Sequence, residues 1–238
     1  MDKLISGAAR LGLFLDAAQI KQFQHYAQEL LDWNQRVNLT AITSDEEIQT
    51  KHFLDSLTVL SGLGRSALPP GMPVMDVGSG AGLPGIPLKI MFPGISLVLL
   101  ESTGKKAAFL QHVVGTLGLK DVVVVNGRAE TVAHVPAYRE RFHLVLARAV
   151  AALPALVELA LPYVERGGCF VAMKKGEITA EVAQADRAIT LLGGRLHGIT
   201  AVDLRELPDR RCLVVIDKVG PTPPPYPRRP GIPEKRPL

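Results

Sequence analysis

One acidic residue and three glycines at alternate positions form the pattern with the clearest chemistry in this sequence. Asp76 is followed by Gly78, Gly80 and Gly82, at the end of the apolar run 74–77. Glycine lets a backbone turn sharply and approach a ligand where a Cβ atom would clash. The alternation is typical of loops that bind S-adenosylmethionine, whose cationic sulfonium and amino-acid end suit a nearby carboxylate. We therefore expect Asp76 and these glycines to bind that cofactor.

The same stretch also fits a second nucleotide motif. Gly80, Gly82 and Gly85 match the GxGxxG fingerprint in which a helix N-terminus binds the pyrophosphate of a dinucleotide. An NAD-dependent oxidoreductase is therefore an alternative. Asp76 would be repelled by two phosphates at this position, which favours the methyl donor.

A second acidic residue follows the next predicted strand. Residues 96–100 form a continuous apolar run, and Glu101 lies at its C-terminal end. Its separation from Gly82 is close to the roughly 20 residues expected between a glycine loop and a ribose-binding acid. A carboxylate there accepts hydrogen bonds from two ribose hydroxyls, so we expect Glu101 to bind ribose. The alternative is an acid that stabilises the N-terminus of the following helix.

Strands alternate with helices between about residues 72 and 219, which predicts an α/β fold with a mostly parallel sheet. The predicted strands are residues 74–77, 96–100, 122–125, 143–147 and 169–173, and the predicted helices are 85–92, 105–117, 154–164 and 179–192. Two last strand-like runs, 195–204 and 212–218, form a closing hairpin. This Rossmann-like arrangement with a C-terminal hairpin is that of class I S-adenosylmethionine-dependent methyltransferases.

The sequence divides into three regions. Amphipathic helical spacing over about 16–37, and a capping box at Ser44 that opens a second helix ending at Gly62, predict an N-terminal helical cap over residues 1–66. A methyltransferase domain follows over residues 67–219. Residues 220–238 hold eight prolines and four basic residues. We expect this basic tail to be disordered or polyproline-like, because it has too little apolar surface to fold.

Composition excludes several classes of protein. The 238 residues are 47% hydrophobic, which is ample for a core, and the net charge of +4 mildly favours a polyanionic partner. The longest apolar stretch, 145–163, is interrupted by two prolines and two charged residues, so no membrane span is expected. Cys169 and Cys212 lack metal-ligand spacing. They predict buried thiols in a reduced, cytoplasmic protein without a metal site.

An ordered set of motifs resembles the bacterial small-subunit rRNA guanine-N7 methyltransferase family, also called glucose-inhibited division protein B. The motifs are WN at 33–34, NLTAI at 38–42, HFLDSL at 52–57, DVGSGAGLPGIPL at 76–88 and RA at 148–149, and the match covers roughly residues 10–218. The resemblance implies a cytoplasmic enzyme that methylates N7 of one guanine in the 530 loop of 16S rRNA, in free rRNA or in the small ribosomal subunit. We expect a monomer. A methyltransferase acting on another RNA, or a non-catalytic RNA-binding module, remains an alternative.

The resemblance also implies which residues contact S-adenosylmethionine. They are Gly78, Leu83, Glu101, Ser102, Thr103, Ala129, Glu130 and Arg148. Within this set, Glu101 with Ser102 and Thr103 would line the ribose and adenine. Ala129 and Glu130 match the adenine-side pair, and Arg148 matches the arginine beside the methyl donor.

The residues after the fourth predicted strand fit transfer to a ring nitrogen. Residues 146–150 read LARAV and lack the Asn or Asp with two prolines that orients an exocyclic amine. Neither cysteine is placed to attack a pyrimidine carbon. Guanine N7 has an in-plane lone pair and no proton to lose, so Arg148 is expected to position the reactants without a general base. We expect His52 and Tyr26 to be packing residues.

Basic residues at the predicted strand ends are candidates for RNA contact. Lys105 and Lys106 follow the second strand, Arg128 follows the third, and Lys174 and Lys175 follow the fifth. All lie at the same expected edge of the sheet as the glycine loop and so face the same ligand. The alternative for each is an ordinary solvated side chain. For the arginine after the fourth strand, the alternatives are contact with guanine or phosphate and a salt bridge that covers the sheet end.

Overall fold

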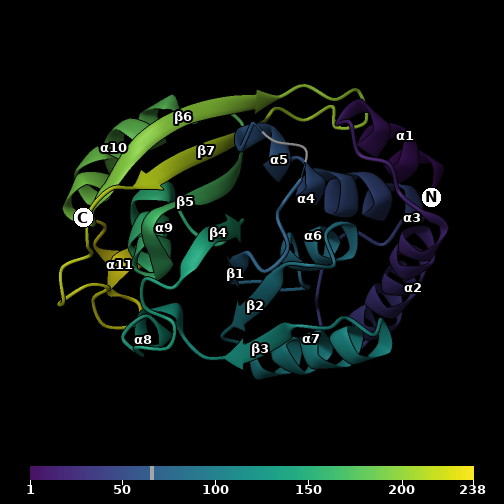
Figure 1. Ribbon diagram of the computed structural model, residues 1–238, viewed down its shortest axis with the longest axis horizontal. Coiled ribbons are helices and arrows are strands. Elements are labelled where there is room, and N and C mark those ends of the chain that lie inside the picture. The colour runs from purple at the N-terminus through teal and green to yellow at the C-terminus, as the bar shows by residue number, and fades with distance from the viewer. Residues whose placement is uncertain (65–66) are drawn as a thin grey trace.

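The computed structural model describes residues 1–64 and 67–238, and its strands form one sheet in the order β3-β2-β1-β4-β5-β7-β6 (Figure 1). Their bounds are β1 Pro73–Val77, β2 Ser96–Glu101, β3 Val122–Asn126, β4 Phe142–Arg148, β5 Val164–Lys175, β6 Gly194–Val202 and β7 Arg211–Lys218. Strands β1 to β5 pair in parallel, whereas β7 is antiparallel to both β5 and β6. The predicted parallel sheet with a closing hairpin is confirmed.

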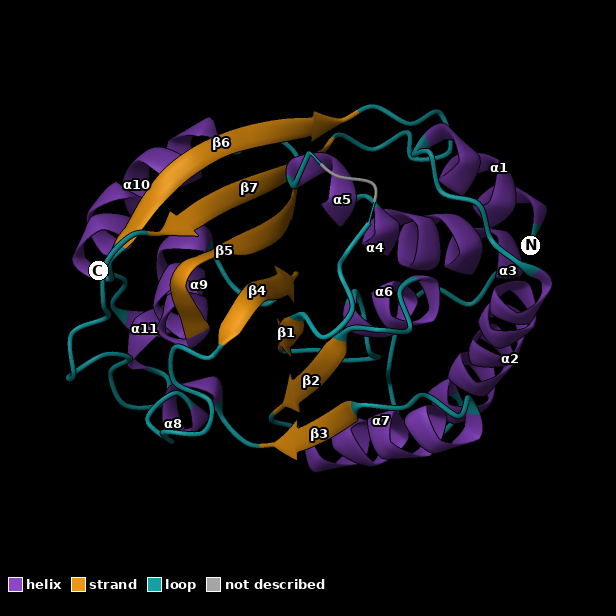
Figure 2. Ribbon diagram, in the orientation of Figure 1, coloured by secondary structure: helices purple, strands orange, loops and turns teal. Residues whose placement is uncertain are grey.

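Helices cover both faces of this sheet (Figure 2). On one side lie α1 Asp2–Arg10, α2 Ala17–Asn34, α3 Asp45–Glu47, the π-helix η1 Ile48–Leu54, α4 Asp55–Leu57, α5 Val59–Gly62, α6 Gly85–Met91 and α7 Gly104–Thr116. On the other lie α8 Ala129–Val132, α9 Leu153–Ala160, the 3-10 helix η2 Leu161–Tyr163, α10 Thr179–Leu191 and α11 Ile232–Lys235. Alternate strand residues face opposite layers, so Val74 packs in one core and Met75 in the other.

The N-terminal helices share the core of the first layer. Leu57 and Leu60 belong to the same buried cluster as Leu213 and Val215 of β7. A Cβ atom at Gly62 would lie 3.0 Å from Leu213, so this glycine lets α5 approach the sheet closely. The boundary expected between the cap and the methyltransferase domain lies between residues 66 and 67, and residue 66 is outside the described residues.

Side-chain caps begin two of the N-terminal helical regions, and the one at Ser44 was predicted from the sequence. Asp16 accepts a hydrogen bond from the backbone N–H of Gln19 at 2.8 Å, and the Gln19 side chain accepts one from the Asp16 N–H at 2.9 Å, which completes a capping box. Ser44 caps the second helical region through the Glu47 N–H at 3.3 Å. The π-helical turn η1 inside that region was not predicted, because apolar spacing does not register one extra residue in a turn.

The C-terminal segment, residues 220–238, is ordered, so the expectation of a disordered tail is wrong. Arg228 forms an ion pair with the fully buried Glu158 at 2.7 Å. Arg139 donates hydrogen bonds to tail carbonyls, including those of Thr222 at 3.0 Å and Tyr226 at 2.9 Å. The prediction of disorder relied on the small number of apolar side chains in this segment. That number does not reveal that the segment is held by one buried ion pair and by hydrogen bonds to its backbone carbonyls.

No helix in the described residues combines the length and apolar character needed to cross a bilayer.

Candidate active site

A cavity of about 520 Å³ opens at the C-terminal ends of β1, β2 and β4. Its lining includes these predicted cofactor contacts: Gly78, Gly80, Leu83, Glu101, Ser102, Thr103 and Arg148. It also includes three of the predicted RNA contacts, Lys106, Arg128 and Lys175. Parallel strand ends are the usual ligand site of α/β sheets, and the volume is within the range of cofactor pockets.

The glycine loop forms one wall of this cavity in a conformation that only glycine adopts readily. Gly78, Gly80 and Gly82 have φ values of 71°, 57° and 87°. A Cβ atom on Gly78 would lie 2.7 Å from Val150, so a side chain there would also displace the opposite wall. The loop stays against β2 because the Gly78 N–H donates to the Leu100 carbonyl at 2.8 Å.

Asp76 and Gly82 lie behind this loop, and neither is among the residues that line the cavity. Asp76 is fully buried, and its Oδ2 accepts a hydrogen bond from the Gly85 N–H at 2.9 Å. Its Oδ1 has no hydrogen-bond partner among the described residues. Burial raises the pKa of Asp76 to about 7. The direct cofactor contact expected from the sequence is thus corrected: Asp76 fixes the loop to α6, and Gly82 packs on Ile86.

Glu101 joins the two loops that flank the cavity. Its Oε2 accepts a hydrogen bond from the Gly80 N–H at 2.9 Å, and its Oε1 accepts one from the Thr103 N–H at 2.7 Å. Each carboxylate oxygen keeps a further lone pair. Because Glu101 also lines the cavity, these lone pairs can accept ribose hydroxyls while the backbone contacts hold the carboxylate in place.

A smaller cavity of about 60 Å³ adjoins the first one at Gly78 and Ser102. Its walls include the apolar side chains of Val77, Leu100, Val150 and Leu159. The predicted adenine-side residues Ala129 and Glu130 line it as well. Together with the adjoining part of the main cavity, this apolar slot with polar groups at its rim suits one edge of a purine ring.

Glu130 is held by internal partners. It is 2% exposed, and its Oε1 accepts a hydrogen bond from Arg128 Nη2 at 2.9 Å. Despite its burial, the pKa of Glu130 is lowered, because Arg128 and the Gly231 N–H stabilise its charged form. Arg128 is therefore partly committed to Glu130, although its side chain lines the cavity.

Arg148, at the end of β4, belongs to a row of charges. Its Nη1 donates to the Lys51 carbonyl at 3.0 Å and to Asp55 Oδ2 at 3.2 Å. Asp55 Oδ1 forms an ion pair with Arg211 Nε at 2.9 Å. The side chains of Asp55 and Arg211 are 5% and 4% exposed. The salt bridge considered for Arg148 is present, and the side chain also lines the cavity, whereas its contact with guanine or phosphate stays a prediction.

This row of charges borders a side cavity of about 230 Å³. Arg148, Asp55 and Arg211 line it together with Met173 and Leu213. Arg211 Nη1 has no hydrogen-bond partner in the described part of the chain. Sequence reasoning assigned no role to Asp55 or Arg211. Asp55 lies inside the quoted HFLDSL motif, which was a usable signal, whereas Arg211 had none.

The predicted RNA-contacting lysines have different surroundings. Lys106 and Lys175 line the main cavity, whereas Lys105 is exposed outside it. Lys174 Nζ forms an ion pair with Glu181 at 2.6 Å and donates to the Ala151 carbonyl at 2.9 Å. The structure therefore brings one lysine of each pair to the cofactor cavity.

His52 and Tyr26 have internal partners, in line with their expected packing role. His52 Nε2 accepts a hydrogen bond from the Thr40 hydroxyl at 2.8 Å, and its Nδ1 donates to the Lys51 carbonyl at 3.2 Å. Burial and the charge of Arg148 lower the pKa of His52 to about 4, so it is neutral at pH 7. Tyr26 is fully buried and donates to the Ala81 carbonyl.

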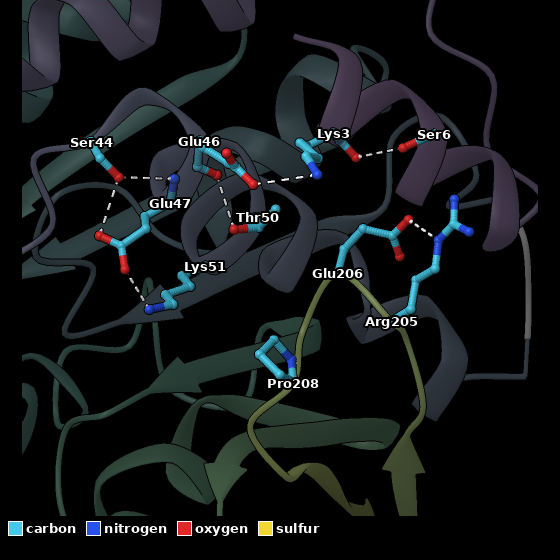
Figure 3. A pocket seen from close by; sticks show the side chains of 10 residues that line it. All are labelled: Lys3, Ser6, Ser44, Glu46, Glu47, Thr50, Lys51, Arg205, Glu206 and Pro208. Carbon is cyan, nitrogen blue, oxygen red and sulfur yellow. Dashed lines mark hydrogen bonds and ion pairs between the residues drawn. The ribbon is translucent and has the colours of Figure 1, made fainter.

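A separate hollow of about 550 Å³ lies between α1, α3, η1 and the β6–β7 loop (Figure 3). Its charged side chains pair with one another: Lys3 with Glu46 at 3.4 Å, and Lys51 with Glu47 at 2.5 Å. Residues of the glycine loop are not part of its lining. This hollow is therefore not the cofactor site.

The described residues of the main cavity fit an adenosyl cofactor. The apolar slot suits the adenine, Glu101 suits the ribose, and the glycine backbone allows close approach of the amino-acid end. The described residues contain no group of His, Cys, Asp and Glu side chains suited to a metal ion.

The chain is similar to known proteins over its full length. A family model described as rRNA small subunit methyltransferase G matches residues 19–208. A protein of that name from Roseiflexus castenholzii is 50% identical over 238 residues, which is 100% of both chains. One from Dehalococcoides mccartyi is 48% identical over 240 residues, again covering 100% of both.

Solved structures of low sequence identity share the fold. An MtNAS mutant in complex with S-adenosylmethionine has a TM-score of 0.56 at 22% identity, covering 84% of this chain and 73% of that one. The [4+2]-cyclase SpnF has a TM-score of 0.54 at 15% identity, covering 70% and 82%. The fold is that of class I S-adenosylmethionine-dependent methyltransferases, as the sheet order predicts.

Proposed function

Because this chain belongs to the rRNA small subunit methyltransferase G family, we propose that it methylates N7 of one guanine in the 530 loop of 16S rRNA. The cofactor is S-adenosylmethionine, which supplies a methyl group bonded to a positively charged sulfur. We propose that it is bound by the cavity residues Gly78, Gly80, Leu83, Glu101, Ser102, Thr103, Ala129 and Glu130. The NAD-dependent alternative has no support from the family or the fold.

The observation that carries the proposal is the junction of the main and side cavities at Arg148 and Asp55, with Arg211 lining the side cavity next to them. Guanine presents two acceptors, O6 and N7, on one edge. Nη1 of Arg211 is a buried donor without a hydrogen-bond partner in the described residues, and O6 is an acceptor that suits it. We propose that the side cavity holds the guanine.

No side chain has to remove a proton in this reaction. N7 would attack the methyl carbon through its in-plane lone pair, the carbon–sulfur bond would break to leave a neutral thioether, and the positive charge would pass to the methylated ring. His52 is neutral, but both of its ring nitrogens are engaged with Thr40 and Lys51. Arg148 and Arg211 orient the reactants, and Asp55 compensates positive charge at the point where the ring acquires it.

The basic side chains around the main cavity support an RNA substrate. Lys106, Arg128 and Lys175 line its wall, where they can contact phosphates on either side of the target nucleotide. Phosphate contacts position an RNA without reading its sequence. We propose that the protein acts as a cytoplasmic monomer on 16S rRNA or on the small subunit.

The proposal is tested by methyl transfer from labelled S-adenosylmethionine to small ribosomal subunits that lack their modifications, and to free 16S rRNA. The modified nucleotide is then mapped. Label at N7 of one guanine in the 530 loop is expected. Label at another nucleotide would refute the proposed guanine as the methyl acceptor and would favour the alternative of another RNA site. The methyltransferase activity itself would still be supported. Cofactor binding without label on either substrate would refute the proposal.

A further inference from the structure

The C-terminal segment, residues 220–238, reaches the adenine side of the cofactor site. Glu234, on α11, lines both the main cavity and the small apolar cavity beside it. The other residues of the small cavity lie between residues 77 and 159. The tail therefore contributes one acidic side chain to a pocket that is otherwise built by strand ends, the loops that follow them, and helices α8 and α9.

The position of α11 is fixed by buried contacts. The Gly231 N–H, directly before the helix, donates to Glu130 Oε1 at 2.8 Å. Further back, Arg228 forms its ion pair with Glu158 on α9, and Figure 1 shows the tail returning past α9 to α11. Pro233 is buried. Glu234 therefore follows a segment that is anchored on both α8 and α9.

Glu234 is a carboxylate with acceptor capacity left at this pocket. Glu130 Oε1 already accepts hydrogen bonds from Arg128 and from Gly231. Glu234 is exposed, and in the described residues it forms no hydrogen bond or ion pair. Its charge does act on Arg128: the pKa of Arg128 is raised, first by the hydrogen bond to Glu130 and also by Glu234. Glu234 therefore lies near the rim of the slot with its acceptor atoms available.

The chemistry of the purine ring determines which of its groups can donate a hydrogen bond to the Glu234 carboxylate. Adenine carries an exocyclic amine, which is a donor, whereas hypoxanthine carries an oxygen in the same place, which is an acceptor. The walls of the slot, such as Val77, Leu100 and Leu159, make apolar contact with either ring and do not distinguish them. A carboxylate at the rim accepts a hydrogen bond from the amine and repels the oxygen.

We propose that Glu234 selects the cofactor by accepting a hydrogen bond from the exocyclic amine of its adenine. The C-terminal segment is then a part of the cofactor site. The inference rests on S-adenosylmethionine as the cofactor and does not depend on which nucleotide is methylated. A failure of this inference can therefore be distinguished from a failure of the proposal that guanine N7 is the site of methylation.

Calorimetric titration with two ligands tests the proposal on the full chain. The ligands are S-adenosylhomocysteine and its deaminated analogue S-inosylhomocysteine, and the proteins are wild type, Glu234→Ala, Glu234→Gln and the neighbouring control Lys235→Ala. We expect Glu234→Ala to weaken binding of the adenosyl ligand roughly three- to tenfold, the size of one partly exposed hydrogen bond. Binding of the inosyl ligand should stay unchanged or improve. Glu234→Gln should be intermediate, because its amide oxygen still accepts, and Lys235→Ala should match wild type.

Two results would overturn the proposal. Equal weakening of both ligands by Glu234→Ala would mean that Glu234 only shapes the cavity wall. Unchanged affinity for both would mean that it does not contact the base. Thermal unfolding of each variant without ligand separates these results from loss of the fold, since an exposed carboxylate should change stability little.

Discussion

The Asp55 carboxylate lies between two arginines, with Oδ2 3.2 Å from Arg148 Nη1 and Oδ1 2.9 Å from Arg211 Nε. One carboxylate thus fixes the guanidinium beside the cofactor cavity and the one beside the side cavity. Removing one partner from a buried ion pair leaves charge uncompensated, which costs about 3–5 kcal/mol. Asp55 is therefore a positioning residue whose effect extends to both cavities.

Asp55→Asn should lower the rate constant of methyl transfer much more than it weakens cofactor binding. The amide has one acceptor oxygen and no charge, so Arg148 and Arg211 lose their fixed separation. We expect kcat to fall about 10- to 100-fold, as for other losses of reactant alignment. The Kd for S-adenosylhomocysteine, measured by calorimetry, should change less than threefold, roughly the scale of one weak contact.

The matched control for this variant is Asp209→Asn. Asp209 lies 3.6 Å from Arg211, but its side chain is 55% exposed, so its ion pair contributes little. It should keep nearly normal turnover. If Asp55→Asn left kcat unchanged, the row of charges would have no part in catalysis.

The buried Asp76 should make stability fall as the pH rises. Its folded-state pKa is about 7 against an ordinary value of 3.8, so the folded chain keeps a proton that the unfolded chain releases. The free energy of unfolding from this group is fully present below about pH 4 and is lost progressively up to about pH 7. Asp76→Asn removes this titration while its amide oxygen can still accept from the Gly85 N–H.

Denaturant unfolding without cofactor, at pH values from 5 to 8, measures this effect. The wild-type free energy of unfolding should fall relative to that of Asp76→Asn by up to about 1.4 kcal/mol per pH unit below pH 7, the value for one proton. The exposed Asp186→Asn serves as the control and should follow wild type. Parallel pH profiles for wild type and Asp76→Asn would show that Asp76 ionises normally in the folded chain.

The strands and the glycine loop that form the site could be predicted from the sequence, because the periodicity of apolar residues and the spacing of glycines are local signals. Residues 96–100 read as a strand that ends at Glu101, and β2 ends there. The order of strands and helices then places every loop after a parallel strand at one edge. Gly78 and Glu101 therefore meet at the cavity, as expected.

Local signals did not predict contacts across the chain. The pattern DxGxGxG places Asp76 in the loop, but whether it faces the ligand or the core depends on the Gly85 N–H, nine positions further on. Arg211 meets Asp55 only because β7 inserts next to β5. The ordered tail likewise depends on Glu158, which lies 70 positions before Arg228.

The anchor of the C-terminal segment should contribute strongly to stability. Arg228→Met leaves the fully buried Glu158 without its charged partner, and we expect a loss of about 3–5 kcal/mol in the free energy of unfolding. Arg229→Met, at the neighbouring exposed position, should change it by about 0.5 kcal/mol or less. Denaturant midpoints provide the measurement.

A double variant distinguishes the contribution of the ion pair to stability from a general disruption of the C-terminal segment. Glu158→Gln combined with Arg228→Met removes both charges, so it should be more stable than Arg228→Met alone. If Arg228→Met were as stable as Arg229→Met, the segment would not be anchored through Glu158.

Lysines that line the cavity should contact RNA phosphates, and the exposed lysine beside one of them should not. Lys106 and Lys175 line the main cavity, whereas Lys105 lies outside it. Removing one lysine that neutralises a phosphate lowers the slope of log K against log salt by about one unit. We therefore expect Lys106→Ala and Lys175→Ala each to lower the slope, and Lys105→Ala to leave it unchanged. Binding of 16S rRNA fragments at several salt concentrations measures the slopes.

An equal decrease for Lys105→Ala would mean that the RNA spreads over the outer face of α7 rather than entering at the cavity, and the proposed path of the RNA backbone would be wrong.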